Sequence, residues 1–201
     1  MAYNGTGVND SVGESRNNLY QAVPDLLAAL NYIENNNKLN NLPLVLIGHS
    51  QGGFAVCSVL NHEESASVKA VVSFAGMNRT KDIVDRYGRR AVGAFYPLLV
   101  PFVYMRDNTD FTSGVSHSAV RGINNTDIPV MLIHSTGDTT VLPNSEAITN
   151  FVDEIVNPNV KIVLLSDEWN NGHHSIFWSK EAYLYRTEVN VSRESYRYRE
   201  M

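Results

Sequence analysis

Three residue types that cooperate in nucleophilic catalysis occur along this chain: a serine, a carboxylate and a histidine. Ser50 lies between two glycines in the stretch Gly-His-Ser-Gln-Gly, Asp138 lies in the turn Ser-Thr-Gly-Asp, and His173 directly follows a glycine. A serine hydroxyl is a poor nucleophile until an imidazole takes its proton. The imidazole in turn needs a carboxylate on its other nitrogen, which fixes its tautomer and stabilises the imidazolium. Ser50, His173 and Asp138 therefore have the residue types that acyl transfer requires.

The residues around Ser50 predict a strand, a sharp turn and a helix. The apolar run 43–47 precedes the turn and predicts a short strand covered on both faces, and residues 51–60 follow with a helical pattern. Such a turn crowds neighbouring Cβ atoms, which would explain Gly48 and Gly52 on either side of the serine. It would also direct the backbone N–H of Gln51 toward an oxyanion developing near Ser50.

The rest of the chain alternates between strand and helix patterns, which predicts right-handed crossovers and a mainly parallel sheet sandwiched by helices. We expect one α/β domain over residues 1–201, built as a three-layer sandwich. The predicted strands are 43–47, 68–75, 128–135 and 160–165, and the predicted helices are 17–34, 51–60, 148–155 and 178–189. Sites in such sheets lie beyond the carboxyl ends of the strands. Ser50, Asp138 and His173 follow three of these strand ends.

Several other residues compete for these roles. Asp167 and Glu168 are alternative carboxylates, but they come after the following strand. His174 is adjacent to His173, so at most one of the two can serve Ser50, and His174 could instead line a pocket or cap the last helix. We take His173 as the base. Cys57 lies on the helix behind Ser50, where a small core residue is expected.

The remaining histidines have less specific interpretations. His49 is the variable residue of the turn and fits packing better than chemistry, and His134 fits a core histidine or a pocket wall. We expect no metal site, because the chain has no His-x-x-x-His motif and no clustered cysteines, and because two adjacent histidines should point apart.

Residues 77–127 interrupt the alternation between the second and third predicted strands. The segment is long, aromatic and contains proline, so we expect an irregular or helical insertion that covers the site as a cap or lid. Its most apolar part, 91–105, is shorter than the roughly 20 residues of a membrane helix and contains Pro97 and Pro101. We interpret it as buried or pocket-lining. Its aromatic residues fit an apolar acyl or aromatic substrate and lid-to-core packing equally well.

Composition excludes several classes of function. The net charge is -5 and no block of like charge stands out, so no nucleic-acid surface is expected. With one cysteine no internal disulfide can form, and the polar N-terminus has no apolar signal region. We therefore expect a cytoplasmic protein with no membrane partner and no cofactor, acting on a small-molecule ester, acyl or peptide substrate.

The chain resembles bacterial α/β-hydrolases of the serine esterase and acyl-peptidase-like group. The matching segments are GHSQGG, VKAVVSFAGMNR, IPVMLIHSTGDTTV and NGHHSIF, and the opening AYNGTGVNDSVGES is similar to the segment that follows an earlier central strand in those proteins. The resemblance covers the chain from Tyr3 to about Arg186. It implies the α/β-hydrolase fold, a triad of Ser50, Asp138 and His173, and hydrolysis of ester or amide bonds through an acyl-enzyme.

The resemblance also implies a departure from the family pattern. Full members have several strands before the point that corresponds to Met1, and one of the preceding loops supplies a second oxyanion N–H. We therefore expect an N-terminally truncated hydrolase fold, with the strand before Ser50 exposed at an edge of the sheet. The alternative function is a truncated, catalytically weak or inactive hydrolase-fold domain that binds a ligand or partner.

Overall fold

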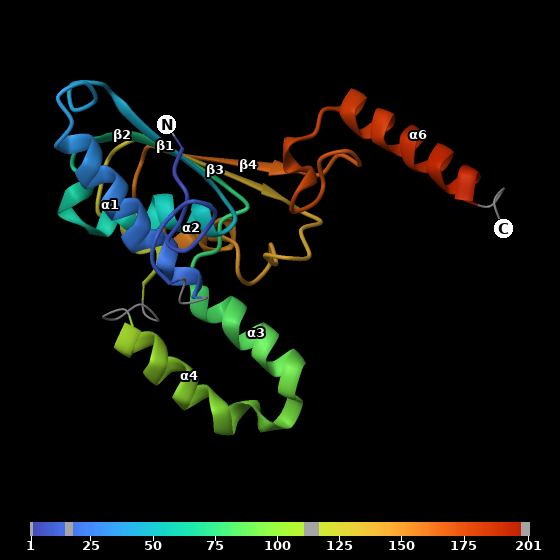
Figure 1. The fold of residues 1–201 in the computed structure, drawn as a ribbon, viewed down its shortest axis with the longest axis horizontal. Helices are drawn as coiled ribbons and strands as arrows, with labels where there is room; N and C mark the ends of the chain where they lie inside the picture. The colour runs from blue at the N-terminus through green and yellow to red at the C-terminus, as the bar shows by residue number, and fades with distance from the viewer. Residues whose placement is uncertain (1, 15–17, 111–116, 198–201) are drawn as a thin grey trace.

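A parallel four-stranded sheet forms the centre of the protein in a computed structural model, which describes residues 2–14, 18–110 and 117–197 (Figure 1). The strands lie in the order β1-β2-β3-β4, and each neighbouring pair is parallel. They are β1 Leu44–His49, β2 Val68–Phe74, β3 Val130–Ser135 and β4 Val160–Leu165. All four predicted strands are present. The strand before Ser50 is an edge strand, as expected from the family resemblance.

The register of the strands divides their side chains between two faces of the sheet. Leu46 lies beside Val71, which lies beside Val130, and all three are buried. The next residues along, Ile47 and Val72, belong to the opposite face, since side chains alternate along a strand. The hydrophobic core therefore fills the face that carries Leu46 and Val71.

The helices of the core pack on this same face. Helix α1 (Ala22–Glu34) contacts α2 (Gln51–Ser58), which lies against β1 and β2 and also contacts α5 (Ala119–Asn124). Pro24 lies in the first turn of α1, where a missing N–H costs no helical hydrogen bond. Short 3-10 helices complete the connections: η1 Leu19–Gln21, η2 Val59–Asn61, η3 Glu63–Ser65, η6 Ile148–Glu154 and η7 Ser175–Phe177. Cys57 is fully buried on α2, and burial raises its thiol pKa to about 12.

The prediction that β1 is covered on both faces is wrong. Val45 is 49% exposed and Ile47 67% exposed, so one face of this edge strand is open among the described residues. On that face the 3-10 helix η7 covers only the end of the sheet, where the ring of Phe177 lies 4.8 Å from that of Phe74. One of the two helical layers expected for a sandwich is thus present in the described part of the chain.

The helix predicted over 148–155 is a 3-10 helix rather than an α-helix. It runs over Ile148–Glu154 and contains a break at Phe151, whose backbone φ of -106° is not helical. Its start is held by long-range backbone contacts, because the N–H of Ile148 donates to the carbonyl of Gly76 and Ala147 pairs with Met77. These anchors at one end of a seven-residue segment favour a short, tight helix.

Two helical elements project from the body of the molecule (Figure 1). Helix α3 (Thr80–Val92), the 3-10 helix η4 (Gly93–Phe95) and α4 (Tyr96–Asp110) form a hairpin below the body in this view, and α6 (Lys180–Arg197) extends to the side, beyond the ends of β3 and β4. The expectation that 91–105 is buried or pocket-lining is wrong for most of that segment, since Phe95, Leu98 and Phe102 are 66–72% exposed while Tyr96 is buried.

The boundaries of the predicted insertion also change. Helix α5, which lies inside 77–127, packs in the core with Ala119 and Ile123 fully buried, so only α3 and α4 project. Residues 111–116 of the insertion and Asn17 of the first predicted helix lie outside the described residues. In the described part of the chain, no helix combines the length and apolarity needed to cross a bilayer.

Candidate active site

Ser50 lies at a strained turn between β1 and α2. Its backbone φ is +56°, a left-handed value that serine rarely adopts. The turn is held to the sheet because the N–H of Ser50 donates to the carbonyl of Phe74 at 2.8 Å, and the carbonyl of Ser50 accepts the N–H of Phe54 in the first turn of α2. Strain maintained by surrounding contacts is typical of functional positions.

The glycines around this turn have different roles. A Cβ on Gly48 would lie 2.2 Å from the backbone oxygen of Gly52, so only glycine fits at position 48. A Cβ on Gly52 would meet nothing within 4 Å, so the prediction that crowding requires glycine there is wrong. The crowded helix position is instead Gly53, where a Cβ would lie 2.8 Å from the carbonyl oxygen of Phe74. The close approach of α2 to β2 explains this glycine.

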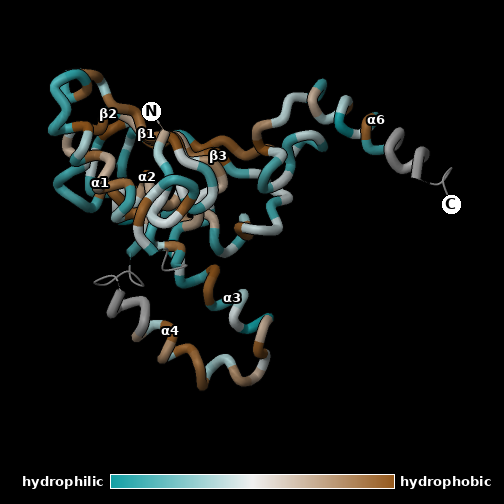
Figure 2. The backbone as a smooth tube through the Cα atoms, in the orientation of Figure 1, coloured by the Kyte–Doolittle hydropathy of each residue, from teal (hydrophilic) through white to brown (hydrophobic). Residues whose placement is uncertain are grey.

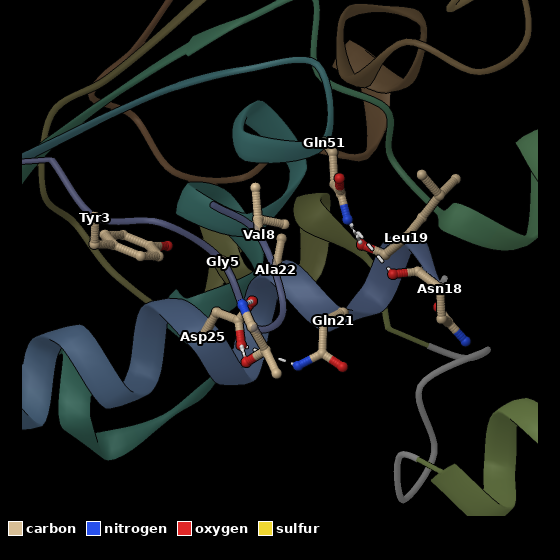
Figure 3. Close-up of a pocket in the computed structure, with 10 residues that line it drawn as sticks. Tyr3, Gly5, Val8, Asn18, Leu19, Gln21, Ala22, Asp25 and Gln51 are labelled. Atoms are coloured by element: carbon tan, nitrogen blue, oxygen red, sulfur yellow. Dashed lines mark hydrogen bonds between the residues drawn. The ribbon is translucent and has the colours of Figure 1, made fainter. Parts of the chain in front are cut away.

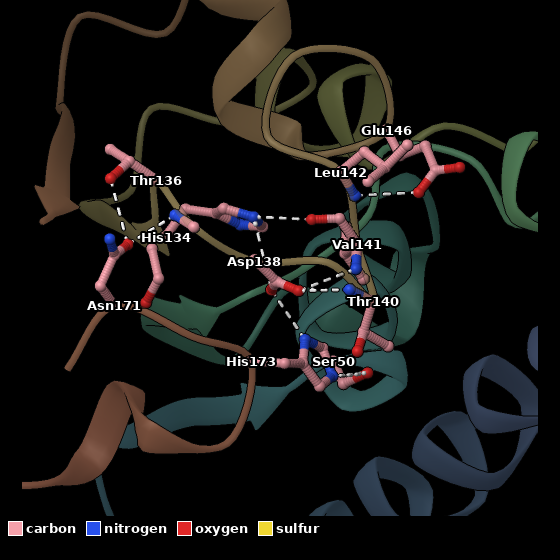
Figure 4. Close-up of polar contacts among 12 residues, drawn as sticks. Ser50, His134, Thr136, Asp138, Thr140, Val141, Leu142, Glu146, Asn171 and His173 are labelled. Atoms are coloured by element: carbon pink, nitrogen blue, oxygen red, sulfur yellow. Dashed lines mark hydrogen bonds and ion pairs between the residues drawn. The ribbon is translucent and has the colours of Figure 1, made fainter. Parts of the chain in front are cut away.

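A row of hydrogen bonds connects Ser50 to His173 and His173 to Asp138 (Figure 4). The Ser50 hydroxyl lies 2.9 Å from Nε2 of His173, and Nδ1 of His173 lies 2.7 Å from Oδ2 of Asp138. Asp138 is 2% exposed and His173 is 7% exposed, which shields the bond between them from water, while Ser50 is half-buried. The structure therefore brings together the three residues selected from the sequence, and it brings His173 rather than His174 to Ser50.

The second oxygen of Asp138 is fixed by the backbone of its own turn. Oδ1 accepts the N–H of Thr140 at 2.8 Å and that of Val141 at 3.0 Å. Burial alone would raise the pKa of Asp138, but the hydrogen bonds from His173, Val141 and Thr140 outweigh burial and lower it. Asp138 is thus held as a carboxylate with one oxygen directed at the imidazole. The sequence Gly-Asp-Thr-Thr-Val carries the signal for this turn, because aspartate often accepts the N–H two residues ahead.

His134 is a buried neighbour of this carboxylate. Its Nε2 lies 3.1 Å from the carbonyl of Val141, to which Nε2–H can donate, and 3.6 Å from Oδ2 of Asp138. Burial lowers the pKa of His134 and favours its neutral form. This contact fits the core histidine that the sequence allowed, and it also ties β3 to the turn that presents Asp138.

The loop that carries His173 is attached on both sides. The side-chain oxygen of Asn171 accepts the N–H of Gly137 at 2.5 Å, and the hydroxyl of Ser135 donates to the carbonyl of Asn170 at 2.8 Å. From the other side, Nε2–H of His49 donates to the carbonyl of His173 at 2.8 Å. His49, interpreted from the sequence as a packing residue, therefore also positions the backbone of His173.

The histidines at the turn lie closer together than expected. Ligand nitrogens of His49, His173 and His174 all lie within 4.8 Å of one another, so the sequence argument that the adjacent histidines point apart is wrong. These three side chains could approach one metal ion. As placed, however, both ring nitrogens of His173 are engaged with Asp138 and Ser50.

A cavity of about 450 Å³ lies on the N-terminal side of α2 (Figure 3). Gln51, the neighbour of Ser50, is part of its wall, and its side-chain amide donates to the carbonyl of Leu19 at 2.9 Å. The Asp25 carboxylate forms part of the wall and accepts hydrogen bonds from the N–H and the hydroxyl of Thr6. Burial and the Asp25 carboxylate together raise the pKa of Tyr3 to about 12. The rest of the wall is formed by Gly5, Val8, Asn18, Gln21 and Ala22.

A comparison with protein families gives a match over much of the chain. Residues 1–127 match the family model described as serine aminopeptidase, S33. This segment is more than half of the chain and contains the turn at Ser50. A comparison with curated proteins gives no match.

Solved structures share the fold at low sequence identity. Est1E from Butyrivibrio proteoclasticus with bound ferulic acid has a TM-score of 0.60 at 18% identity, over 92% of this chain and 74% of its own. An esterase from Pyrococcus furiosus has a TM-score of 0.57 at 17% identity, over 96% of this chain and 68% of its own. An alpha-beta serine hydrolase homologue from Coxiella burnetii has a TM-score of 0.53 at 19% identity, over 94% of this chain and 66% of its own. These likenesses confirm the α/β-hydrolase fold, and the chain spans about two thirds of the length of such proteins.

Proposed function

The chain belongs to the serine aminopeptidase S33 family of hydrolases, and from this premise we propose that it hydrolyses a carboxylic ester or a small acyl or peptide bond through an acyl-enzyme on Ser50. The observation that carries this proposal is the hydrogen-bonded row from Ser50 through His173 to Asp138, with heavy-atom distances of 2.9 and 2.7 Å. Two of the structural neighbours are an esterase and a protein with bound ferulic acid. They favour an ester over an amide as the substrate.

In the proposed first step, the Ser50 oxygen attacks the carbonyl carbon of the substrate while Nε2 of His173 takes the hydroxyl proton. The new imidazolium is stabilised by Asp138, whose pKa is lowered by its hydrogen bonds and which therefore stays ionised. The imidazolium then gives its proton to the leaving alcohol or amine. In the second step, water activated by His173 attacks the acyl group, and Ser50 is regenerated with its proton.

The negative charge that develops on the substrate oxygen needs hydrogen-bond donors. Gln51 is the first residue of α2, and the first N–H groups of a helix have no partner within the helix. We assign the backbone N–H of Gln51 as one oxyanion donor, helped by the positive end of the α2 dipole. The side chain of Gln51 is held by Leu19, which keeps this end of the helix fixed.

The cavity beside Gln51 is our candidate for the substrate pocket. Its volume of about 450 Å³ is in the range of small-molecule sites. Asp25 and Tyr3 give it a polar side, while Val8, Leu19 and Ala22 give it an apolar one. The hairpin of α3 and α4, within residues 77–127, is our candidate for the expected cap, because Arg86 on α3 donates to the carbonyl of Thr140, in the turn that presents Asp138.

Steady-state hydrolysis of p-nitrophenyl acetate by the 201-residue chain tests this proposal. Ser50→Ala should remove turnover above the uncatalysed rate, whereas Ser67→Ala, at an exposed serine away from the turn, should leave kcat/KM unchanged. Parallel assays with an amino-acid p-nitroanilide distinguish ester from amide specificity. If the wild-type chain binds an ester analogue without turning over any substrate, the non-catalytic alternative is favoured. If Ser50→Ala retains wild-type turnover, Ser50 is not the nucleophile.

A further inference from the structure

The first ten residues of helix α4, 96–105, are apolar on all sides, whereas 106–110 read Arg-Asp-Asn-Thr-Asp, and only one side of the apolar part packs against the protein. Tyr96 and Tyr104 face α3, and both of their hydroxyls donate to Asp85. Val100 and Val103 lie on the same side by helical spacing and are half-buried. A helix without a polar face normally requires an apolar environment all round. The side of α4 that faces away from α3 therefore exposes apolar surface that an apolar partner would cover.

The outward side carries a continuous apolar stripe, which we call the hairpin stripe. Its members are spaced by three, four and seven residues, which places them on one face of the helix and the turn before it. They are Phe95, Leu98, Leu99 and Phe102, with exposed fractions of 72, 70, 43 and 66%. Figure 2 shows hydrophobic residues concentrated along α4, away from the core of the sheet, while α3 is mixed.

Two basic side chains lie at the end of α3, just before the turn in which the hairpin stripe begins. Arg89 and Arg90 occupy the last turn of α3, directly before the turn that leads to Phe95. Both are exposed, and in the described part of the chain neither forms an ion pair. The guanidinium of Arg89 lies 5.4 Å from the centre of the Tyr96 ring, which holds it beside the start of α4. This positive site is present on a chain whose net charge is -5, so it is a local feature and not a consequence of composition.

We propose that the tip of the α3–α4 hairpin docks on an anionic lipid bilayer. Phe95, Leu98 and Phe102 enter the boundary between headgroups and acyl chains, while Arg89 and Arg90 contact the lipid phosphates. An exposed apolar stripe alone would also fit a protein partner. The adjoining arginines favour an anionic surface, because an apolar interface between two copies would bring these like charges together. No helix in the described residues is suited to cross the bilayer, so the hairpin lies in its surface.

Helix α3 attaches the hairpin to the segment that follows Asp138. Arg86 on α3 forms a double ion pair with Glu146 and donates to the carbonyl of Thr140, close to the turn that presents Asp138. Asp85 joins α3 to α4 through the two tyrosines. Docking of the tip would therefore orient the whole molecule on the membrane. This inference goes beyond the proposed hydrolase activity and stands or fails independently of it, and it departs from the expectation of no membrane partner that composition suggested.

Flotation of the full chain with lipid vesicles tests the proposal. Vesicles of pure phosphatidylcholine are compared with vesicles containing about one third phosphatidylglycerol, at low salt and at about 0.5 M salt. We expect binding to the anionic vesicles only, and a loss of binding at high salt, because salt screens the arginines. Arg89→Gln with Arg90→Gln should weaken binding about 25-fold, since each lost charge is worth about fivefold. Leu98→Gln with Phe102→Gln should weaken it by about tenfold or more.

Matched controls use exposed residues away from the hairpin. Leu184→Gln on α6 removes an exposed leucine, and Lys161→Gln on β4 removes an exposed positive charge. Neither should change vesicle binding. The proposal is overturned if the chain does not float with anionic vesicles, if it binds neutral vesicles equally well, or if the hairpin variants bind like the controls. It is also overturned if the hairpin variants convert a dimer to a monomer in sedimentation, because the stripe would then be covered by a second copy.

Discussion

Replacing Asp138 by asparagine changes one atom at the most buried part of the site. Oδ1 of Asp138 accepts two backbone N–H groups, from Thr140 and Val141. In the variant, the amide oxygen should occupy that position, because an NH₂ group there would face two donors. The NH₂ group then faces Nδ1 of His173, which lies 2.7 Å from Oδ2 in the native site. His173 can accept that N–H only as the tautomer whose proton is on Nε2, and this tautomer cannot take the proton of Ser50.

The expected loss follows from this change of tautomer. The equivalent change in another serine hydrolase lowers kcat by about 10⁴-fold with the geometry intact, so we expect a loss of roughly 10³- to 10⁴-fold here. The assay is kcat for p-nitrophenyl acetate, with circular dichroism to verify the fold. Asp167→Asn is the matched control, because it changes the nearest competing carboxylate in the sequence and should keep activity. The reasoning is refuted if Asp138→Asn keeps kcat within tenfold of the wild type, or if the two variants lose activity equally.

Three further predictions follow from the structure. Burial lowers the pKa of His134, so this histidine is protonated in the unfolded state at a higher pH than in the folded state, and stability should fall as pH drops below about 6.5. His134→Gln should reduce the fall in Tm between pH 7 and pH 5, and an unchanged fall would contradict this reasoning. Gly48→Ala should lower Tm and abolish activity, because the new Cβ would lie 2.2 Å from the backbone oxygen of Gly52. Gly52→Ala should be neutral or should stabilise the protein by about 1 kcal/mol, because its Cβ would meet no atom. Equal effects of the two variants in thermal melts would contradict the described geometry of the turn. Arg86→Met removes the ion-pair partner of the buried Glu146 carboxylate, which then keeps the N–H of Leu142, and should cost about 3–5 kcal/mol in urea unfolding. A cost below about 1 kcal/mol would show that the pair is not coupled to folding.

The parts of the fold that follow from local periodicity could be predicted from the sequence. Apolar runs gave all four strands, and the strand-end rule selected Asp138 and His173 from among several carboxylates and histidines, because parallel strands end at one edge of the sheet. The turn at Ser50 was predictable for the same reason, since a strand pattern changes to a helix pattern within five residues. The prediction that position 48 requires glycine is confirmed, but a sequence cannot show which neighbouring backbone atom a Cβ would meet.

Features that depend on non-local contacts could not be predicted. The choice between His173 and His174 depends on how Asn170 and Asn171 attach their loop to the end of β3. The exposure of Ile47 depends on which elements cover each face of the sheet, which periodicity does not specify. The apolar run around Phe95 has the composition of a buried segment, and only the position of the hairpin outside the body shows that its outer side is open.

Covalent labelling of Ser50 tests the central claim most directly. A fluorophosphonate reacts with a serine only where a base removes its proton and donors stabilise the resulting oxyanion. Intact-mass spectrometry of the wild-type chain should show one adduct, peptide mapping should place it on Ser50, and Ser50→Ala should remain unlabelled. An adduct that persists in Ser50→Ala, or that maps to another residue, would contradict the account.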